Sequence, residues 1–506
     1  MFNKIKTYSP KRNKFDLSHE RKLSANMGDL VPIMCQEVLP GDSFRVNSEL
    51  LVRFAPMLAP MMHRVNVFTH FFFVPNRLVW SEWESFITGG ADGTAAPVAP
   101  YFLGPCQPLA VPRFGLGSLP DYFGLPVTSL TPSANQKKIS ALPFRAYQTI
   151  YNEYYRDQNL STAVPITKNS GEIDIIADAA ELDATLSMRK RSWEHDYFTS
   201  ALPWSQRGGA VAVPGDGAYY TKQGGTNDGD PAAAGAVTMG AGGILQDSAP
   251  DNLRHEVSTL INDLRKANSL QRFLEKMALG GSRYVEQMKT MFGVSSSDAR
   301  LQRPEYLGGS RSPVVVSEVL SNFQFSGDAE GLPQGNMAGH GIAAGSNHGF
   351  KRSFEEHGYV IGILSVLPKT AYQQGLPKHF QRFDRFDYAW PDFAHLGEQE
   401  VLTRELYWDM GLPQQGNDST FGYQARYADY KYQPSTVHGD FRENLAFWHM
   451  SRIFTAEPSL NAGFVESDPT TRIFAVEDPA LHHLYCQVYN DVSALRPLPY
   501  FGTPSL

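Results

Sequence analysis

One stretch of the chain, from Phe44 to Trp80, limits the folds that are open to it. The stretch holds two apolar runs, 44–54 and 65–74, joined by a short connector that contains Pro56 and Pro60. In the second run, aromatic and β-branched residues occupy both alternating faces, so a strand formed there has no face suited to water. We therefore expect a strand covered on both sides, which Pro75 ends because proline cannot donate to a strand ladder. The alternation places Val65, Val67, Thr69, Phe71 and Phe73 on one face, and Phe68, His70, Phe72 and Val74 on the other.

The rest of the chain predicts one β domain with long helical excursions. Further strand patterns occur at 314–325, 359–368 and 481–495. Helical patterns cover 81–88, 141–157, 253–278 and 282–292, and the third of these carries a long apolar stripe. Strands near both ends of a chain, with helices between them, indicate a mainly β single domain over residues 31–506.

Two Gly-rich segments interrupt this pattern. Residues 208–250 consist mostly of small and polar residues without a sustained period, which is typical of a surface insertion. Residues 327–349 predict a second Gly-rich loop. Within the insertion, we expect these residues at the surface: Gly208, Asp216, Tyr219, Tyr220, Asp228 and Asp230.

Charge is distributed unevenly along the chain. The formal net charge of the 506 residues is −7, but the first 22 residues carry seven basic side chains and two acidic ones. Residues 1–30 therefore predict a basic N-terminal arm, either a contact for a polyanion such as nucleic acid or a solvated tail. The candidate contacts are Lys4, Lys6, Lys11, Arg12, Lys14, Arg21 and Lys22.

Several classes of function find no support in the sequence. The three cysteines are widely spaced, which argues against a disulfide framework or a cysteine metal site and favours a reducing compartment. We expect no signal peptide and no membrane insertion. Scattered histidines and carboxylates form no metal-binding or catalytic pattern, so we expect no metal, no cofactor and no enzymatic activity. The charged content of 19% is low, which suggests that much of the surface contacts other chains.

Two segments, 379–390 and 426–442, interleave aromatic and basic residues. Their cations, including Arg426 and Lys431, have the chemistry to contact phosphates while the rings stack on bases. Alternatively, the rings pack in the core or at subunit contacts, and the charges pair with neighbouring aspartates. The sequence favours the second alternative without excluding the first.

The chain resembles the major capsid proteins of microviruses, the small icosahedral single-stranded DNA phages, and especially of their gokushovirus branch. The resemblance rests on several stretches that together span most of the chain outside the Gly-rich segments. These stretches are MCQEVLPGDSFRVNSELLVRFAPMLAPMMHRVNVFTHFFFVPNRLVW, HDYFTSALPW, TLINDLRKANSLQRFLEKMALGGSRYVEQMKTMFGV, DARLQRPEYLGGS, FDYAWPDFAHLGEQ and YQARYADYKYQPSTVHGDFR.

The resemblance implies an eight-stranded antiparallel jelly roll with long inserted loops that contain helices. It also implies self-assembly, through pentamers, into a T=1 icosahedral shell around circular single-stranded DNA. The insertion at 208–250 would then project at the three-fold axes and take part in attachment to a host cell-surface receptor. By resemblance alone, further partners are an internal scaffolding protein, a DNA-pilot protein and a small basic DNA-binding protein. Assembly is expected in the cytoplasm of a host bacterium, and the final location is the virion.

A second hypothesis is a carbohydrate-binding or carbohydrate-cleaving jelly-roll protein. Such a protein would also present aromatic and acidic residues on loops. The two hypotheses differ in the size of the native particle, since a capsid protein forms pentamers or shells.

Overall fold

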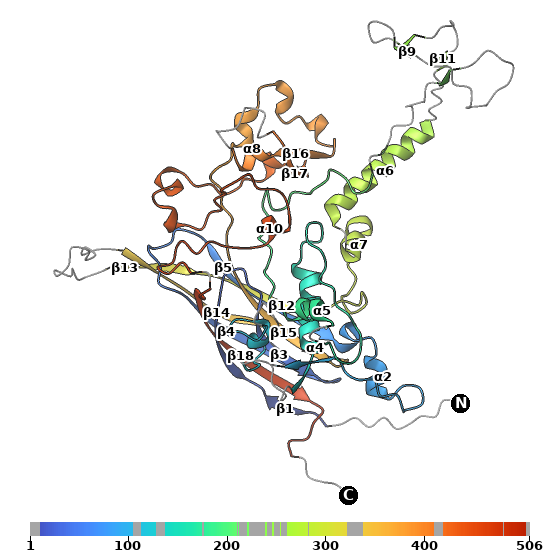
Figure 1. Cartoon of the computed structure of the whole chain (residues 1–506), viewed down its shortest axis with the longest axis vertical. Coiled ribbons are helices and arrows are strands. Elements are labelled where there is room, and N and C mark those ends of the chain that lie inside the picture. The colour runs from blue at the N-terminus through green and yellow to red at the C-terminus, as the bar shows by residue number, and fades with distance from the viewer. Residues whose placement is uncertain are drawn as a thin grey trace, which may run out of the picture.

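Two antiparallel β-sheets that face each other form the centre of the molecule (Figure 1). The computed structural model describes residues 11–104, 113–127, 137–174, 177–209, 211, 220–221, 238–239, 245–246, 253–254, 261–281, 283–320, 337–408, 418–478 and 480–501. The strands of the six-stranded sheet are β1 (Asn13–Asp16), β2 (His19–Ala25), β4 (Ser43–Phe54), β13 (Val315–Leu320), β14 (Met337–Ser353) and β18 (Leu484–Arg496). The strands of the four-stranded sheet are β3 (Val31–Val38), β5 (Val65–Pro75), β12 (Glu305–Pro313) and β15 (Gly358–Pro368).

The order of the strands differs from their order in the chain. In the six-stranded sheet, β18 pairs on one side with β1 and β2 in succession and on the other side with β4, which is followed by β14 and β13. In the four-stranded sheet the order is β12, β5, β15, β3. All of these pairings are antiparallel and most join distant parts of the chain.

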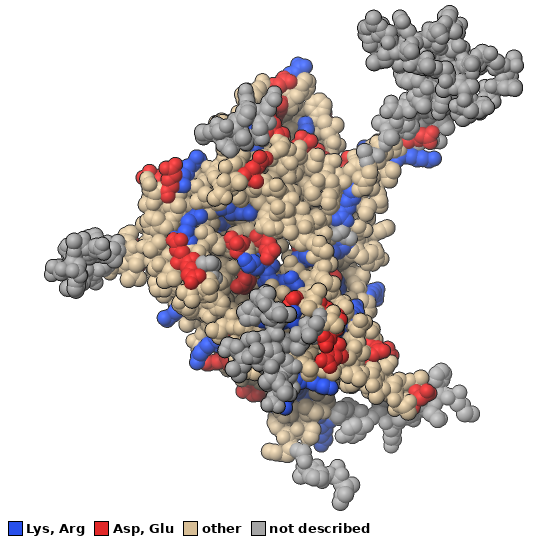
Figure 2. Space-filling model, viewed as in Figure 1, with Lys and Arg blue, Asp and Glu red and all other residues tan. Residues whose placement is uncertain are grey.

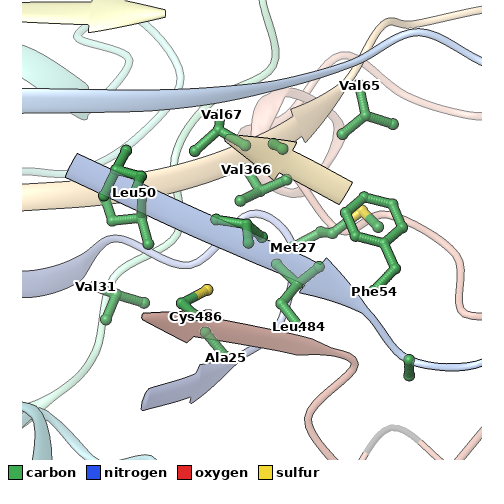
Figure 3. Close-up of a cluster of buried hydrophobic side chains, with 14 of the residues drawn as sticks. Ala25, Met27, Val31, Leu50, Phe54, Val65, Val67, Val366, Leu484 and Cys486 are labelled. Carbon is green, nitrogen blue, oxygen red and sulfur yellow. The ribbon is translucent and has the colours of Figure 1, made fainter. Parts of the chain in front are cut away.

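Apolar side chains fill the space between the two sheets. Figure 3 shows Leu50 and Phe54 of β4 and Leu484 of β18 lying against Val67 of β5 and Val366 of β15. A second cluster continues this core at the other end of the sheets, where Phe71 and Phe73 of β5 meet Phe44 of β4. Burial of this apolar area holds the two sheets together.

Strand β5 confirms the prediction of a strand covered on both faces. Its odd-numbered residues from Val65 to Phe73 face the six-stranded sheet, and all but one of its residues are buried. On the opposite face, Phe72 and Val74 pack against a helical layer that includes Phe144, Tyr147 and Ile150. The four-stranded sheet is therefore a middle layer, since it is covered by the other sheet on one face and by helices on the other.

The helical layer and its neighbours come from the long connection between β5 and β12. Its elements are α1 (Asn76–Val79), α2 (Trp83–Thr88), β6 (Tyr101–Gly104), α3 (Leu119–Tyr122), β7 (Lys137–Ser140), α4 (Leu142–Ile150), the π-helical turn η1 (Tyr151–Tyr155) and α5 (Ala179–Leu186). The same connection continues into β8 (Tyr220–Thr221), β9 (Thr238–Met239), β10 (Leu245–Gln246), β11 (Leu253–Arg254), α6 (Ile261–Gly280) and α7 (Tyr284–Phe292). Helix α6 extends away from the sheets (Figure 1).

A separate apolar cluster supports the aromatic-rich part of the chain between β15 and β18. It joins Tyr197 and Phe198 to Val401, Leu406 and Phe421. The elements here are η2 (Lys378–Gln381), η3 (Arg385–Asp387), η4 (Pro391–Phe393), β16 (Glu398–Leu402), α8 (Thr403–Leu406), β17 (Thr420–Ala425), α9 (Ala428–Lys431), η5 (Gly439–Arg442), η6 (Ala446–Trp448) and α10 (Ala462–Val465). Apart from the β16–β17 pair, the elements of this part are helices of three or four residues.

The structure corrects three of the predicted boundaries. Much of the expected basic arm is part of the sheet, because residues 13–16 and 19–25 pair with β18, while residues 1–10 lie outside the described residues. The expected helix over 253–278 begins only at Ile261, and Leu253–Arg254 forms the short strand β11.

The third correction concerns the expected Gly-rich loop at 327–349. Residues 337–349 belong to β14, which pairs with β4 and β13. A side chain at Gly339 would collide with the carbonyl oxygen of Ala59, and one at Gly349 with that of Val46. The glycines therefore permit the close approach of neighbouring backbones, which explains why glycine occurs within this strand. The remainder of the expected loop, up to residue 336, lies outside the described residues.

Candidate assembly and nucleic-acid surfaces

The basic residues near the N-terminus lie along the edge of the six-stranded sheet where the structure describes them. Four of them are exposed: Lys11, Arg12, Lys14 and Lys22. The Nζ atom of Lys22 lies 3.9 Å from a carboxylate oxygen of Glu20, and both side chains are well exposed, so this pair leaves the lysine available. Lys4 and Lys6 lie outside the described residues.

Arg21 differs from these four residues because it supports the fold. Its guanidinium donates a hydrogen bond of 2.8 Å to the carbonyl oxygen of Tyr122, and burial lowers its pKa. Since the group is engaged within the chain, Arg21 is a poorer candidate for contact with nucleic acid than Lys22.

The outer face of the six-stranded sheet is open, and a shallow depression lies on it. Tyr485 of β18 lies opposite Arg53 of β4, and Gln487 lies opposite Lys22 of β2. The depression measures about 490 Å³, and none of its described lining residues is acidic. Two cations beside a half-exposed tyrosine ring can hold phosphates while a base stacks on the ring.

Arg53 and Tyr485 were not among the residues that the sequence pointed to. The sequence of β18 could have identified Tyr485, because its residues alternate and Tyr485, Gln487 and Tyr489 are exposed between buried neighbours. Four residues further along β18, the open face also carries negative charge, because Glu49 of β4 and Glu20 of β2 lie opposite Tyr489. Figure 2 shows a similar interspersion of basic and acidic residues on the face it displays.

A group of exposed aromatic rings lies in the part of the chain after β15. We call it the aromatic platform, and its members are Phe380, Phe383, Phe386, Tyr388, Trp390 and Tyr430. Their exposed fractions run from 47% for Trp390 to 90% for Phe383. Packing in the core of the chain is therefore wrong for these six rings, whereas Tyr427 of the second segment is buried.

Arg382 organises part of this platform from beneath. Its guanidinium pairs with the carboxylate of Asp429, and both side chains are almost buried. It also lies 4.0 Å from the centre of the Tyr430 ring and 5.8 Å from that of Tyr388. A desolvated cation at these distances attracts both rings and fixes their positions.

The backbone of the platform is held by side-chain hydrogen bonds. The carboxylate of Asp387 accepts from the amides of Phe383 and Asp384, each at 2.8 Å. These two bonds lower the pKa of Asp387, which therefore stays ionised. The indole of Trp390 donates to the carbonyl oxygen of Arg385 at 2.7 Å.

Arg426 and Lys431, the two candidates from the second aromatic segment, lie close to each other. Lys431 is exposed and donates to the backbone oxygen of Arg426 at 3.0 Å. The guanidinium of Arg426 lies 5.0 Å from the ring of Tyr427 and is half-buried. Of this pair, only Lys431 has an exposed side chain, and it lies next to Tyr430 of the aromatic platform.

The structure describes few of the residues expected in a surface protrusion. Gly208 is exposed and has a backbone φ of +94°, and Tyr220 belongs to β8, which pairs with β11. Asp216, Tyr219, Asp228 and Asp230 lie outside the described residues. Helix α6, which follows this segment, exposes half or more of Ile261 and Leu264.

A cleft of about 1390 Å³ lies where the four-stranded sheet meets the start of α7. Three of its six lysine and arginine side chains, those of Arg283, Arg303 and Lys369, form ion pairs there. Arg303 lies 3.1 Å from Asp298, and Lys369 lies 3.5 Å from Glu194. Burial lowers the pKa of His70 to about 4, so that this histidine is neutral at physiological pH. These pairings give the cleft the character of a structural junction.

The described residues contain no group of three or more His, Cys, Asp or Glu side chains arranged to hold a metal ion. Nor does any described helix combine the length and apolar character that crossing a membrane requires.

Comparison with known proteins gives matches over nearly the whole chain. The family model described as "Capsid protein (F protein)" matches residues 3–506. The capsid protein VP1 of Chlamydia phage 1 is 37% identical, with 100% of this chain and 97% of that protein covered. The capsid protein VP1 of Bdellovibrio phage phiMH2K is also 37% identical, with the same coverage. The capsid protein VP1 of Spiroplasma virus 4 is 31% identical over 98% of this chain and 95% of that protein.

Proposed function

The chain belongs to the capsid protein (F protein) family, and from this membership we propose that many copies of it build a T=1 icosahedral shell around circular single-stranded DNA. It is a major capsid protein of the microvirus type, a structural component of the virion and not an enzyme. The observation that carries the proposal is the match to capsid proteins along the full length of the chain. The carbohydrate-binding alternative finds no support in this family.

The fold proposed for the shell-forming part is an eight-stranded jelly roll. The eight strands are β2, β3, β4, β5, β12, β14, β15 and β18. Numbered from one to eight along the chain, they lie in the order 1-8-3-6 in one sheet (β2-β18-β4-β14) and 2-7-4-5 in the other (β3-β15-β5-β12). Two such interleaved four-stranded sheets are the arrangement expected of two Greek keys. Strands β1 and β13 are then additions to this framework.

We propose that the open face of the six-stranded sheet looks into the shell and contacts DNA. The arrangement of layers supports this orientation. The helical layer covers the four-stranded sheet on the opposite side of the molecule, and α6 extends from that side (Figure 1). Lys22, Arg53 and Tyr485 would contact phosphates and bases without reading their sequence. The exposed residues Lys11, Arg12 and Lys14 lie at the edge of the same sheet, whereas Lys4 and Lys6 lie outside the described residues.

The insertion at 208–250 is proposed as a surface protrusion at the three-fold axes that contributes to host attachment. Its support is helix α6, which follows this segment in the chain and extends away from the sheets. Deleting residues 208–250 should leave particle formation intact and reduce attachment. Loss of particle formation would contradict a role confined to attachment.

The remaining partners are proposed by resemblance to the microvirus capsid proteins. We propose pentamers as intermediates, an internal scaffolding protein, a DNA-pilot protein and a small basic DNA-binding protein as partners, and assembly in the cytoplasm of a host bacterium.

Sizing the chain expressed with these partners tests the central proposal. Shells or pentamers seen by sedimentation and electron microscopy are the expected result. A chain that stays monomeric at high concentration, with its partners present, would contradict it.

A further inference from the structure

The aromatic platform is a large exposed apolar surface. The exposed fractions of Phe380, Phe383, Phe386, Tyr388 and Trp390 add up to about three whole rings. At roughly 200 Å² for each ring, these five side chains expose about 600 Å². One side of a standard protein interface buries about 800 Å², whereas the largest apolar patch of a typical monomer covers about 300–600 Å². The five rings together therefore reach the upper end of the range for a monomer patch and about three quarters of one side of a standard interface.

Hydrogen bonds hold the backbone of the platform to the rest of the chain. Tyr430 accepts from the amide of Ala389 at 3.3 Å, and Tyr427 accepts from the amide of Trp390 at 3.2 Å. Together with the Arg382–Asp429 pair, these bonds tie the exposed segment to helix α9. A preformed surface loses little side-chain entropy on binding, which is how aromatic residues come to dominate the energy of interfaces.

The charges of the platform disfavour a polyanion as its partner. Residues 378–396 hold three basic side chains and three carboxylates, so their formal charges cancel. Arg382 is neutralised by Asp429, and Asp387 stays ionised through its backbone hydrogen bonds. A DNA phosphate placed over these rings would meet the ionised Asp387 as well as the exposed cations of Arg385 and Lys431, so the platform offers no net positive charge to a polyanion. Neutral aromatic surfaces with buried arginines are instead typical of contacts between proteins.

We infer that the aromatic platform is a contact surface for a second copy of this chain within the shell. The inference rests on the proposed function, because a shell of one protein requires each copy to bury surface against its neighbours. Among the exposed rings, Phe383 has the most area to lose and Trp390 has a fixed position, so these two residues are the expected centre of the contact.

The test compares Phe383→Asp with Phe383→Leu in the full chain, expressed with its natural partners. The aspartate variant should raise the subunit concentration needed for half-assembly at least about tenfold, and the leucine variant should assemble nearly as the wild type does. Both variants should keep the wild-type unfolding midpoint, since the side chain contacts little within the subunit.

Oxidative footprinting of Trp390 supplies an independent readout. Its reactivity should fall between dissociated subunits and assembled shells, whether or not the shells contain DNA. Protection in DNA-filled particles alone would identify nucleic acid as the partner and overturn the inference.

Normal assembly of Phe383→Asp, with reduced attachment to cells, would identify a receptor instead and would likewise overturn it. In both of these cases the wild type still assembles, so the proposed function stands. A wild-type chain that never assembles would remove the proposed function and this inference together.

Discussion

Replacement of Arg145 by methionine gives a sharp test of how the helical layer is stabilised. The side chain of Arg145 is 1% exposed, and its guanidinium joins three segments of the layer. It donates to the carbonyl oxygen of Asn169 at 3.0 Å and to Thr167 Oγ1 at 3.3 Å, and it pairs with Glu181 at 3.3 Å. Methionine keeps the apolar stem but leaves these acceptors without their donor.

The expected cost is about 3 kcal/mol in the free energy of unfolding of the subunit. Removing one partner of a buried ion pair typically costs about 3–5 kcal/mol, because the other charge remains buried and uncompensated. The side chain of Glu181 is 19% exposed, so water relieves part of this penalty and places the value near the lower bound. Arg77→Met is the matched control, since the side chains of the Arg77–Glu356 pair are 34% and 42% exposed, and pairs that water reaches contribute about 0–1 kcal/mol.

The assay is urea unfolding of dissociated subunits, followed by tryptophan fluorescence. The double variant Arg145→Met with Glu181→Met should recover at least about 1 kcal/mol, because it removes the uncompensated carboxylate. A cost for Arg145→Met below about 1 kcal/mol, or equal to that of Arg77→Met, would refute the reasoning.

Three further predictions concern other parts of the chain. Burial and the nearby Glu275 raise the pKa of Glu398 to about 7, above its unfolded value of about 4.3, so the folded subunit binds the extra proton between these values. Subunit stability should therefore fall as the pH rises from about 4.5 to 7, and Glu398→Gln should flatten this part of the profile of melting temperature against pH. Lys22→Gln and Arg53→Gln should each reduce the slope of log binding constant against log salt concentration by about 0.7 for single-stranded DNA. Fluorescence anisotropy measures this slope, and unchanged slopes would contradict a DNA contact on the open sheet face. Gly281→Ala should lower the free energy of unfolding by about 1–2 kcal/mol because of the backbone φ of +89°, and by more because the added methyl group would collide with Glu286 and Gln158. Gly293→Ala should show only the cost of its positive φ, since no atom lies near its added methyl group. Equal rates of proteolysis between α6 and α7 in the two variants would refute this difference in stability.

The sequence predicted the parts of the fold that depend on local periodicity. The alternation in 65–74 predicted a strand with two covered faces, and β5 has them because odd and even side chains enter different clusters. The helical spacing in 141–157 likewise predicted α4 and η1. In both cases the signal lies within about ten neighbouring residues, where side-chain direction follows directly from backbone geometry.

Features that depend on distant partners were not visible in the sequence. Strand β2 is polar and basic, and only its pairing with β18 makes it a strand. The glycines of β14 resemble those of a loop until the carbonyl groups of neighbouring chain segments are placed beside them. Arg382 and Asp429 are 47 residues apart, so their pairing beneath the platform could not be inferred from spacing.

The sequence also did not distinguish a buried aromatic ring from an exposed one. Phe73 and Phe383 both lie in aromatic-rich segments, yet one is 3% exposed and the other 90%. The difference arises because Phe73 belongs to a strand between two layers, while Phe383 lies in a short irregular segment that no other part of the described chain covers. Composition alone measures how many rings a chain has, and the fold decides where they lie.

The position of β18 has a consequence for how each copy is made. This strand is the shared neighbour of β2 and β4, but it follows Ala25 by about 460 residues. At roughly 5–20 residues per second, a ribosome takes on the order of 20–90 s to synthesise the intervening chain. Until then β2 and β4 lack the strand that joins them, and a polypeptide interrupted anywhere earlier never acquires it. Completion of translation thus acts as a checkpoint, and truncated products are expected to be left out of the particle.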